Sequence, residues 1–550
     1  MACAAVTFFL LALLAFKKLK PVDLASALAP FALAPILFFF PLNIISTIIF
    51  TVITALTACR LFLIVPNFKV KKSSGRLWLP LLVILIAAFI VQGIYIHIEA
   101  WKRQFMLFPD WGLFSEIAYN TVQGNYFHTY WHGDVSFMGD HFEPGFFAVF
   151  IPLIWLFPSP YTTIVFGAVL LWGSALLIYK FSRSRKLPPA WAFAMALIYL
   201  CFPAVSNMNL SMFYGFHPDY LFIPVFILFA IAFEQKKYRM AFLIFLYSLT
   251  LKETNGALWF GWGICQIVGG KRKWGMIYAV IGVVYFLLCM KCITPYFRSN
   301  SGNYQYLPDY AALGSGIFEI ALSPILRPEV FWSRLLSVHN LEFILLLILP
   351  VFMLAFNRFI LIFSGSVILV FLFLRGNPDA VNLNFWYQTE NMVMLNVFAV
   401  MGLVTVIKGR GEKVKLFGTC YSGVPSFWVR IITSGLDTNL KRKKLAGALL
   451  IGCLVAAGLS HYFYARSFYG CYSYKNILQK PDCTAVVDEV KKIIPVDDHV
   501  SADARCGSHL IIRNRVWGLK YKTQKWVFYD LGDSLRVPFD FHLKMMKNKD

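Results

Sequence analysis

The sequence predicts an all-α polytopic membrane protein that ends in a small α/β domain outside the membrane. Three observations lead to this fold class. The 550-residue chain is 59% hydrophobic and only 14% charged, whereas soluble chains carry about 25% charged residues. Apolar runs long enough to cross a bilayer follow one another along most of the chain. Residues 464–550 lose these runs and carry mixed charge.

The apolar runs set the expected number of spans. Runs of about 17–25 residues cross a bilayer, and about fourteen runs are candidates, so we expect about 13–14 transmembrane helices. Several runs are short and are expected to extend into neighbouring polar positions. The first is expected to be retained, because its lysines follow the apolar run, unlike those of a signal peptide. The runs lie near residues 3–16, 22–41, 43–66, 78–98, 160–180, 190–206, 220–234, 239–251, 255–268, 274–294, 341–356, 358–374, 391–407 and 445–463.

Basic residues distinguish the two sides of the predicted membrane protein. Clusters of Lys and Arg occupy alternate connections, and the positive-inside rule places all of them in the cytoplasm with one orientation. The net charge of +23 is therefore interpreted as a topology signal, and nucleic-acid binding is not expected. The clusters are Lys17/Lys18/Lys20, Lys69/Lys71/Lys72/Arg76, Arg183/Arg185/Lys186, Lys236/Lys237/Arg239, Lys271/Arg272/Lys273, Arg358 and the segment 408–444.

This orientation predicts how the chain is divided. The expected location is the cell membrane, with the C-terminal domain on the extracytoplasmic side and most acids and histidines facing the same side. The expected parts are extra N-terminal transmembrane helices in 1–76, a transmembrane catalytic core in 77–407 with an external loop at 99–159, a basic cytoplasmic loop at 408–444, a last transmembrane helix at 445–463 and an extracytoplasmic α/β domain at 464–550.

The segment FPDWGLFSE at 108–116 places Asp110 at the edge of the bilayer. Residues 111–122 have the apolar spacing of a short amphipathic helix lying along the membrane interface. Asp110 then either caps this helix at its positive end or takes part in chemistry. These residues alone leave both interpretations open. Glu116 is interpreted as a neighbour without a role.

A second segment, GDHFEPG at 139–145, groups Asp140, His141 and Glu143 before an apolar run. Carboxylate and imidazole groups are possible ligands for Mg²⁺ or Mn²⁺, and each can also serve as a general base. The alternative is a solvated polar loop. Three ionisable groups beside a membrane-embedded stretch favour a site, because charge is costly to solvate there.

Two further segments carry charge at the same predicted depth. MFYGFHPDYLFIP at 212–224 contains His217 and Asp219, and LYSLTLKETNGALWFGWG at 246–263 contains Lys252 and Glu253. The second pair is either an exposed hairpin pair or a functional pair. The short flanking runs place it within the membrane boundary, where an unpaired charge is costly. Four separated segments therefore deliver ionisable groups to one side, which is typical of an active site assembled from distant stretches.

The order of these motifs resembles a prokaryotic multi-pass membrane family of unassigned function related to GT-C glycosyltransferases. The residues that carry the resemblance are the Asp after a long span, HFEP, HPD, KE and a tail with VSADARCGSHLIIRNRVW and KWVFYDLGD. The resemblance covers about residues 78–550. Two features depart from the pattern: NFWYQTENM at 384–392 lacks a histidine, and the first loop has no tandem Asp-Asp.

The resemblance implies a GT-C-like fold and a membrane glycosyltransferase. It would move a sugar from a polyprenyl-phosphate donor to an extracytoplasmic glycan, lipid or protein acceptor, with inversion, and a divalent cation (Mg²⁺ or Mn²⁺) as the one possible cofactor. Asp110 matches the position of the catalytic base. Acceptor or metal candidates are Asp140, His141, Glu143, His217 and Asp219; lipid-phosphate candidates are Lys252, Arg298 and Arg327; Glu253 is a supporting residue.

The C-terminal tail predicts a short strand near Val500 followed by a helix, and a second strand in KWVFYDLGD. Asp530 and Asp533 are interpreted as turn residues rather than ligands. Cys471 and Cys483 are candidates for a disulfide with Cys506 left over, but spacing does not decide the pairing.

Two other classes compete with the enzyme. A polytopic transporter or flippase would carry ionisable groups near the midplane within repeated halves, whereas here they gather at one mouth without an evident repeat. A structural or assembly factor of the envelope would use the tail as a binding module. A one-sided cavity lined by the four segments would favour the transferase.

Overall fold

The computed structural model describes residues 44–64, 75–298, 306–358, 363–408, 413–416, 419–422, 442–465, 474–519 and 524–530. The runs predicted near 3–16 and 22–41, together with Cys471 and Asp533, lie outside these ranges. The main helices are α3 (Ile44–Ile64), α4 (Trp78–Lys102), α5 (Leu113–Val122), α6 (Pro144–Leu156), α7 (Pro160–Ser184), α8 (Pro189–Leu200), α9 (Pro203–Met208), α10 (Phe222–Glu234), α11 (Tyr238–Leu249), α12 (Asn255–Val268), α13 (Arg272–Leu288), α14 (Thr294–Phe297), α15 (Ile317–Leu326), α16 (Pro328–Leu335), α17 (Val338–Ile348), α18 (Phe352–Ala355), α20 (Ser366–Leu374), α21 (Thr389–Lys408), α23 (Arg442–Tyr464), α24 (Tyr474–Leu478), α25 (Thr484–Ile493) and α26 (Ala504–Gly507).

The described chain is a helical bundle with fewer full-length spans than the apolar runs suggest. Seven helices are long and apolar enough to cross a membrane, or eight if a pair bent by 50° after α8 counts as one. Several predicted runs form shorter helices, such as α10 with 13 residues and α11 with 12. A helix of that length does not cross about 30 Å of hydrocarbon alone. Within the described residues, hydropathy therefore identified the apolar segments, of which seven or eight are long enough to span singly.

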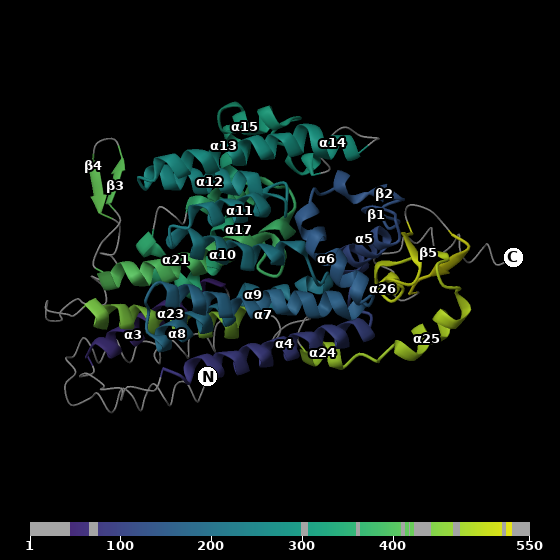
Figure 1. The fold of residues 1–550 in the computed structure, drawn as a ribbon, viewed down its shortest axis with the longest axis horizontal. Coiled ribbons are helices and arrows are strands. Elements are labelled where there is room, and N and C mark those ends of the chain that lie inside the picture. The colour runs from purple at the N-terminus through teal and green to yellow at the C-terminus, as the bar shows by residue number, and fades with distance from the viewer. Residues whose placement is uncertain are drawn as a thin grey trace.

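Figure 1 shows the long helices lying side by side, with α4 at one face of the bundle and α12, α13 and α15 at the opposite face. Helix α21 runs through the interior, and almost all its residues are buried. It contacts α10, α18 and α23. A continuous hydrophobic core extends from these helices to the C-terminal domain.

Glycines let α12 and α13 approach closely. A Cβ at Gly256 would lie 2.4 Å from the carbonyl oxygen of Gly282, and a Cβ at Gly263 would lie 2.6 Å from that of Gly275. The two glycines of α12 are seven residues apart, as are the two of α13, so each helix carries one stripe of small residues. Such stripes allow backbones in membrane helices to touch. The turn that carries Lys252 and Glu253 lies immediately before α12, at one end of this close helix pair.

The C-terminal domain confirms the predicted α/β fold. Strands β5 (His499–Ala502), β6 (Arg515–Gly518) and β7 (Trp526–Phe528) form a parallel sheet of order β6-β5-β7, with α26 following β5 as expected. The indole of Trp101 donates to the carbonyl of Ser508 at 3.2 Å and stacks on His509. The domain therefore packs directly on the end of α4. A separate antiparallel hairpin, β3 (Lys413–Leu416) with β4 (Thr419–Ser422), lies in the basic segment.

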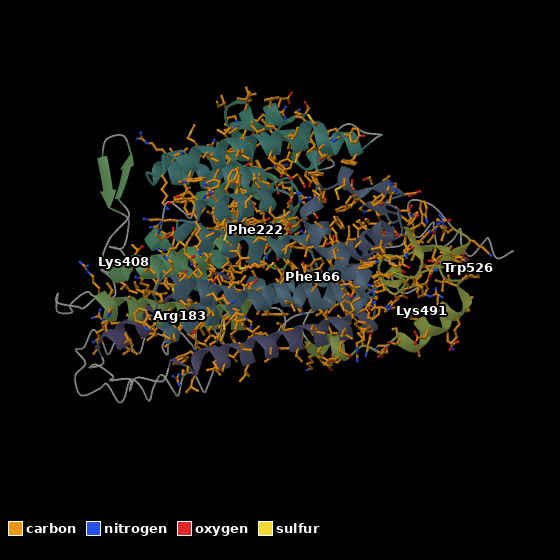
Figure 2. The ribbon with its side chains drawn as sticks, viewed as in Figure 1. Phe166, Arg183, Phe222, Lys408, Lys491 and Trp526 are labelled. Carbon is orange, nitrogen blue, oxygen red and sulfur yellow. The ribbon has the colours of Figure 1, made fainter. Side chains whose placement is uncertain are left out.

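Two basic residues near helix ends lie at one end of the bundle. Figure 2 places Arg183 and Lys408 at one end, and Lys491 and Trp526 of the C-terminal domain at the other. Arg183 ends α7 and Lys408 ends α21. Basic helix ends therefore gather at the end of the bundle opposite the C-terminal domain.

Candidate functional site

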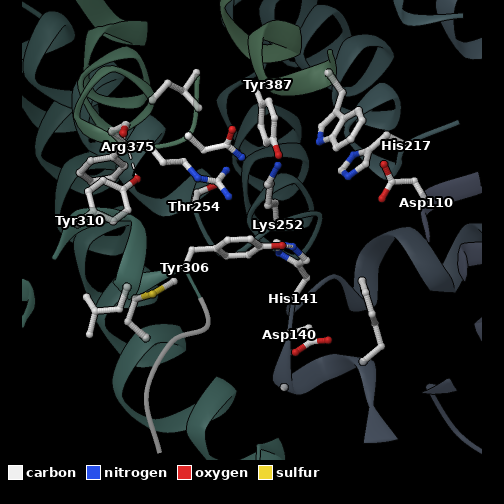
Figure 3. A pocket seen from close by; sticks show the side chains of 18 of the residues that line it. Asp110, Asp140, His141, His217, Lys252, Thr254, Tyr306, Tyr310, Arg375 and Tyr387 are labelled. Carbon is white, nitrogen blue, oxygen red and sulfur yellow. Dashed lines mark hydrogen bonds between the residues drawn. The ribbon is translucent and has the colours of Figure 1, made fainter. Parts of the chain in front are cut away.

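A cavity of about 1390 Å³ lies where the loop after α4 meets the ends of several helices. Its walls include Asp110, Asp140, His141, His217, Lys252 and Arg298, six of the residues predicted from sequence. Figure 3 shows Lys252 and His141 at its centre, with Asp110 and His217 on one side and Arg375 on the other. Three other predicted residues contact residues of this wall. Asp219 pairs with Lys252, and Glu143 and Glu253 lie next to His141. Arg327 stands apart from this wall: it is exposed and donates to the carbonyl of Ala312 at 3.0 Å.

Backbone contacts join the loop after α4 to the HPD segment. The amide of Leu107 donates to Phe213 at 2.8 Å, and that of Trp111 donates to Tyr214 at 3.1 Å. Gly215 has φ of +74°, and a Cβ there would lie 3.0 Å from the Cβ of Trp111. Glycine is therefore required both by the backbone conformation and by the close approach. These contacts bring Asp110 and His217 to the same wall.

A second close approach joins HFEP to the KE turn. The amide of Gly145 donates to the carbonyl of Thr250 at 2.9 Å. A Cβ at Gly145 would lie 2.1 Å from Thr250 Oγ1, so a larger residue would separate the two segments. The glycine after HFEP therefore sets the distance between His141 and Glu253.

Asp110 lies inside a π-helical turn, η2 (Phe108–Gly112), and no side-chain cap is formed there or at the start of α5. The capping interpretation of Asp110 is therefore wrong. Its Oδ2 is buried, and within the described chain it has no hydrogen-bond partner. Burial raises the pKa of Asp110 well above its ordinary value, and the nearby Asp219 adds to the shift while Lys252 opposes it. A carboxyl held in this way is a stronger base than an ordinary Asp.

Helix α5 is buried by protein, whereas its amphipathic pattern suggested a helix with one face exposed at the membrane interface. Eight of its residues are buried, including Glu116. It is covered by α6 and by a hairpin of β1 (His128–Thr129) and β2 (Val135–Ser136). Its polar positions face protein rather than water, because later parts of the chain fold over it.

Lys252 and Asp219 form a buried ion pair, with Nζ to Oδ2 at 2.6 Å. Burial alone would raise the pKa of Asp219, but the Lys252 ammonium outweighs it and the pKa falls below the usual range. The pKa of Lys252 is raised: burial opposes the charge, and Asp219 more than compensates. Both groups are therefore charged at neutral pH.

His217 is neutral at that pH. Burial lowers its pKa to about 4, against an opposing effect of Asp219. Its Nδ1 accepts from the amide of Asp219 at 3.3 Å, and the ring stacks on Trp386 with centroids 4.2 Å apart. A neutral imidazole beside an indole face suits a polar, uncharged ligand group.

His141 and Glu253 form the second polar pair. His141 Nδ1 lies 3.0 Å from Glu253 Oε1, and its Nε2 lies 2.8 Å from the hydroxyl of Tyr306. Glu143 is fully buried beside them, and burial raises its pKa well above the ordinary value. Asp140 is oriented elsewhere, with its Oδ2 3.0 Å from His132 Nδ1. The GDHFEPG segment thus splits into two hydrogen-bonded groups.

Sequence reasoning missed Arg375 and Tyr306. Arg375 follows α20, its Nε donates to Asp309 Oδ2 at 2.5 Å, and its guanidinium lies 4.6 Å from the ring centre of Tyr306 and 5.4 Å from that of Tyr387. Its position, a lone Arg after an apolar run on the predicted external side, was an available signal. Tyr306 gave none, because a tyrosine in a long connection is unremarkable in sequence.

The NFWYQTENM segment also contributes to the cavity despite its missing histidine. Trp386, Tyr387 and Glu390 line the wall at the start of α21. Histidine enters the same region from His217, which stacks on Trp386. A histidine in this part of the cavity is therefore supplied by another segment, through His217.

One part of the cavity wall is apolar. It is formed by side chains from the α13 region, α15, α16 and α20, and Arg375 at the end of α20 lies where this part meets the polar part. The apolar residues are Phe286, Met290, Ile320, Ala321, Pro324, Phe331, Ile368, Val370, Phe371, Leu372 and Leu374. The outer face of α15 is exposed at Phe318, Leu322 and Ile325. Helix α15 is therefore a thin wall between the cavity and the surroundings of the bundle.

Fold and site together define a polytopic helical membrane protein with a large cavity near one end. A family model described as "Predicted membrane protein (DUF2079)" matches residues 109–531, and the chain belongs to this family. This confirms the resemblance to a membrane family of unassigned function. No curated protein matches the sequence.

Among solved structures, the chain is similar to ArnT from Cupriavidus metallidurans, in a crystal structure bound to undecaprenyl phosphate. The TM-score is 0.40 and the identity is 12%, over 78% of this chain and 84% of that chain.

Proposed function

We propose that this protein is a membrane glycosyltransferase that moves a sugar from a polyprenyl-phosphate donor to an acceptor on the extracytoplasmic side. The observation that carries the proposal is the lining of this cavity, in which an apolar part adjoins a cluster of carboxylates and cations. A lipid-linked sugar phosphate has the same order of parts: an apolar tail, an anionic phosphate and a polar sugar.

The positions of basic residues indicate the side of the membrane that the site faces. The basic ends Arg183 and Lys408 lie opposite the C-terminal domain, and basic residues favour the cytoplasmic side. The loop that carries Asp110 packs against the C-terminal domain, because a Cβ at Gly507 would lie 3.3 Å from Trp131. The end of α4, immediately before this loop, contacts the same domain through Trp101. The site would then open towards the extracytoplasmic side.

Asp110 is the proposed base. It accepts the proton of the acceptor hydroxyl while the acceptor oxygen forms a bond to C1 of the sugar. The bond from C1 to the phosphate oxygen breaks, and the lipid phosphate leaves with the electron pair. Attack opposite the leaving group inverts the anomeric configuration. A base with a raised pKa suits this proton transfer, because catalysis is most efficient when the pKa approaches the working pH.

Lys252 and Arg375 are the proposed phosphate ligands. Both are charged and both line the cavity. Asp309 holds one edge of the Arg375 guanidinium, and Tyr306 and Tyr387 contact its planar face. A guanidinium oriented in this way can bind phosphate through two parallel hydrogen bonds, whereas Lys252 acts as a point charge. Arg298 also lines the wall and adds positive charge. Arg327 is not retained as a ligand, because it lies outside this wall.

The test is an assay of the purified protein with a panel of polyprenyl-phosphate sugars and extracted envelope acceptors. Wild type should transfer sugar, and Asp110→Asn should lose about 10²–10⁴-fold in rate, the usual contribution of a general base. Asp488→Asn, on the exposed side of α25, is the matched control and should keep the wild-type rate.

Two outcomes would contradict the proposal. Full activity of Asp110→Asn would exclude this residue as base. Movement of labelled lipid-linked sugar across proteoliposome membranes, without any transfer, would instead support the flippase alternative.

A further inference from the structure

We propose that His141, Glu143 and Glu253 form a binding site for one divalent transition-metal ion, Mn²⁺ or Zn²⁺. Within the described chain, the three side chains offer donor atoms that all lie within 4.8 Å of one another. Two of the residues come from positions 141–143 and the third from the KE turn, so the site exists only when these segments pack together. The set differs from the metal candidates expected from sequence, because Asp140, His217 and Asp219 have other partners.

The independent observation is the state of Glu143. Its exposed fraction is 0%, and neither carboxylate oxygen has a hydrogen-bond partner within the described residues. A buried carboxylate without partners is very unfavourable, and buried charges normally pair or coordinate metals. The oxygens lie next to a histidine nitrogen and a second carboxylate. A cation between the three groups would satisfy Glu143 directly.

The surrounding charge favours a cation of more than one unit. The set itself contains two carboxylates, Glu143 and Glu253. Lys252 is already paired with Asp219 at 2.6 Å. Two ionised carboxylates carry the charge that one divalent ion neutralises, which a water molecule cannot do.

The donor set and spacing suit Mn²⁺ or Zn²⁺. Imidazole is a ligand for Zn²⁺, and carboxylates also suit Mn²⁺. Metal–ligand bonds of about 2.0–2.2 Å place ligand atoms at most about 4.4 Å apart. His141 Nδ1 and Glu253 Oε1 are 3.0 Å apart, within that limit. The three donor atoms lie within 4.8 Å of one another, so an ion would draw them slightly closer together.

The outer contacts orient these ligands. The hydroxyl of Tyr306 lies 2.8 Å from His141 Nε2, and the amide of Phe142 donates to Glu253 Oε2 at 3.3 Å. With metal on Nδ1, the Nε2–H would donate to Tyr306, which fixes the ring tautomer. His141 also lines the cavity, so an ion can enter through it. Under the proposed function, the ion would add positive charge where the lipid phosphate leaves, and this clause alone rests on that function.

The experiment measures metal binding without any transfer assay. Purified full-length protein in detergent is stripped with EDTA, titrated with Mn²⁺ or Zn²⁺, and the bound metal is counted by mass spectrometry. Wild type should bind one equivalent, and the ion should raise its Tm. Glu143→Gln and Glu253→Gln should each weaken binding more than 100-fold, and Tyr306→Phe about 10-fold, since outer-contact mutations typically cost 10–100-fold. Glu489→Gln, on the surface of α25, is the matched control and should bind like wild type.

The metal-free Tm of each variant shows whether it is folded, so a loss of binding in a folded variant can be interpreted. Wild-type protein that binds neither ion would overturn the proposal, as would folded Glu143→Gln and Glu253→Gln variants that bind normally. Metal binding without sugar transfer would contradict only the proposed function. Transfer by a metal-free protein would contradict only a role of the ion in catalysis.

Discussion

Two regions of this protein bury carboxyl groups, and they do so in different ways. In the cavity region, Asp110, Glu143, Asp219 and Glu253 lie near Lys252 and two histidines. In the region under the C-terminal domain, Glu116 is buried alone, with Thr129 donating to its Oε2 at 2.7 Å. The first region pairs two of its four carboxylates, Asp219 with Lys252 and Glu253 with His141, beside a cavity. The second neutralises its carboxyl and has no cavity-lining role. Burial of an acid is therefore not by itself a sign of function; opposite charge and access to a cavity distinguish the two.

The largest effect is expected where a charge pair in the cavity region is broken. Lys252→Met leaves Asp219 buried without its partner and should cost about 3–5 kcal/mol of unfolding free energy. Chemical denaturation in detergent measures this. The double variant Lys252→Met/Asp219→Asn should recover most of the stability and still lack transfer activity. An unchanged unfolding midpoint in Lys252→Met would show that the pair does not stabilise the fold.

Substitution of Glu116 is expected to increase the free energy of unfolding rather than to decrease it. Burial raises its pKa to about 8, against the hydrogen bond from Thr129. An acid whose folded pKa lies above its unfolded value destabilises the fold progressively as pH rises from about 4.5 to 8. Glu116→Gln should therefore gain about 4 kcal/mol over wild type at pH 8 and almost nothing at pH 4.5. Thermal unfolding at both pH values, with Glu489→Gln as control, measures the difference. An equal gain at both pH values would point to packing rather than ionisation.

The pH dependence of transfer follows from the raised pKa of Asp110. The base must be ionised to accept a proton, so kcat/KM should fall about tenfold for each pH unit below that pKa. This acidic limb should lie well above about 3.9, the ordinary value for Asp. A pH–rate profile measures it, with Asp488→Asn as control. An acidic limb near 4 would mean that Asp110 is solvated during turnover.

The smallest effect is expected in the apolar part of the cavity. Ala321→Trp fills space on the inner side of α15 and should raise KM for a long-chain donor about fivefold, by displacing one or two methylene groups of the tail at about 0.8 kcal/mol each. A short-chain donor analogue should show no change. Leu322→Trp, on the exposed face of the same helix, is the matched control. Equal KM values for both variants and both donors would show that the lipid tail does not occupy this part of the cavity.

Much of the site could be predicted from sequence because its parts are local motifs. HFEP, HPD and KE each place ionisable residues beside apolar runs, and the charge pattern assigns them to one side. Arg298 was chosen by sidedness alone and does line the cavity, whereas Arg327, chosen in the same way, does not. Sidedness gives a residue's depth, but not its angle around the bundle. Arg375 and Tyr306 were missed for the same reason, because each reaches the cavity only through the packing of α20 and the connection before α15.

The sequence by itself determined the membrane class, the helical fold and the small C-terminal α/β domain, and it predicts the side on which the ionisable residues gather. Those features depend on hydropathy, charge and short-range spacing, which are properties of single segments. The tertiary structure alone decided that Asp110 does not cap a helix, that α5 is buried, and that Glu143 faces His141 and Glu253 rather than water. These features depend on close approaches at Gly145 and Gly215 between segments about 100 residues apart. Local pattern cannot specify such contacts, because each requires the shape of both partners.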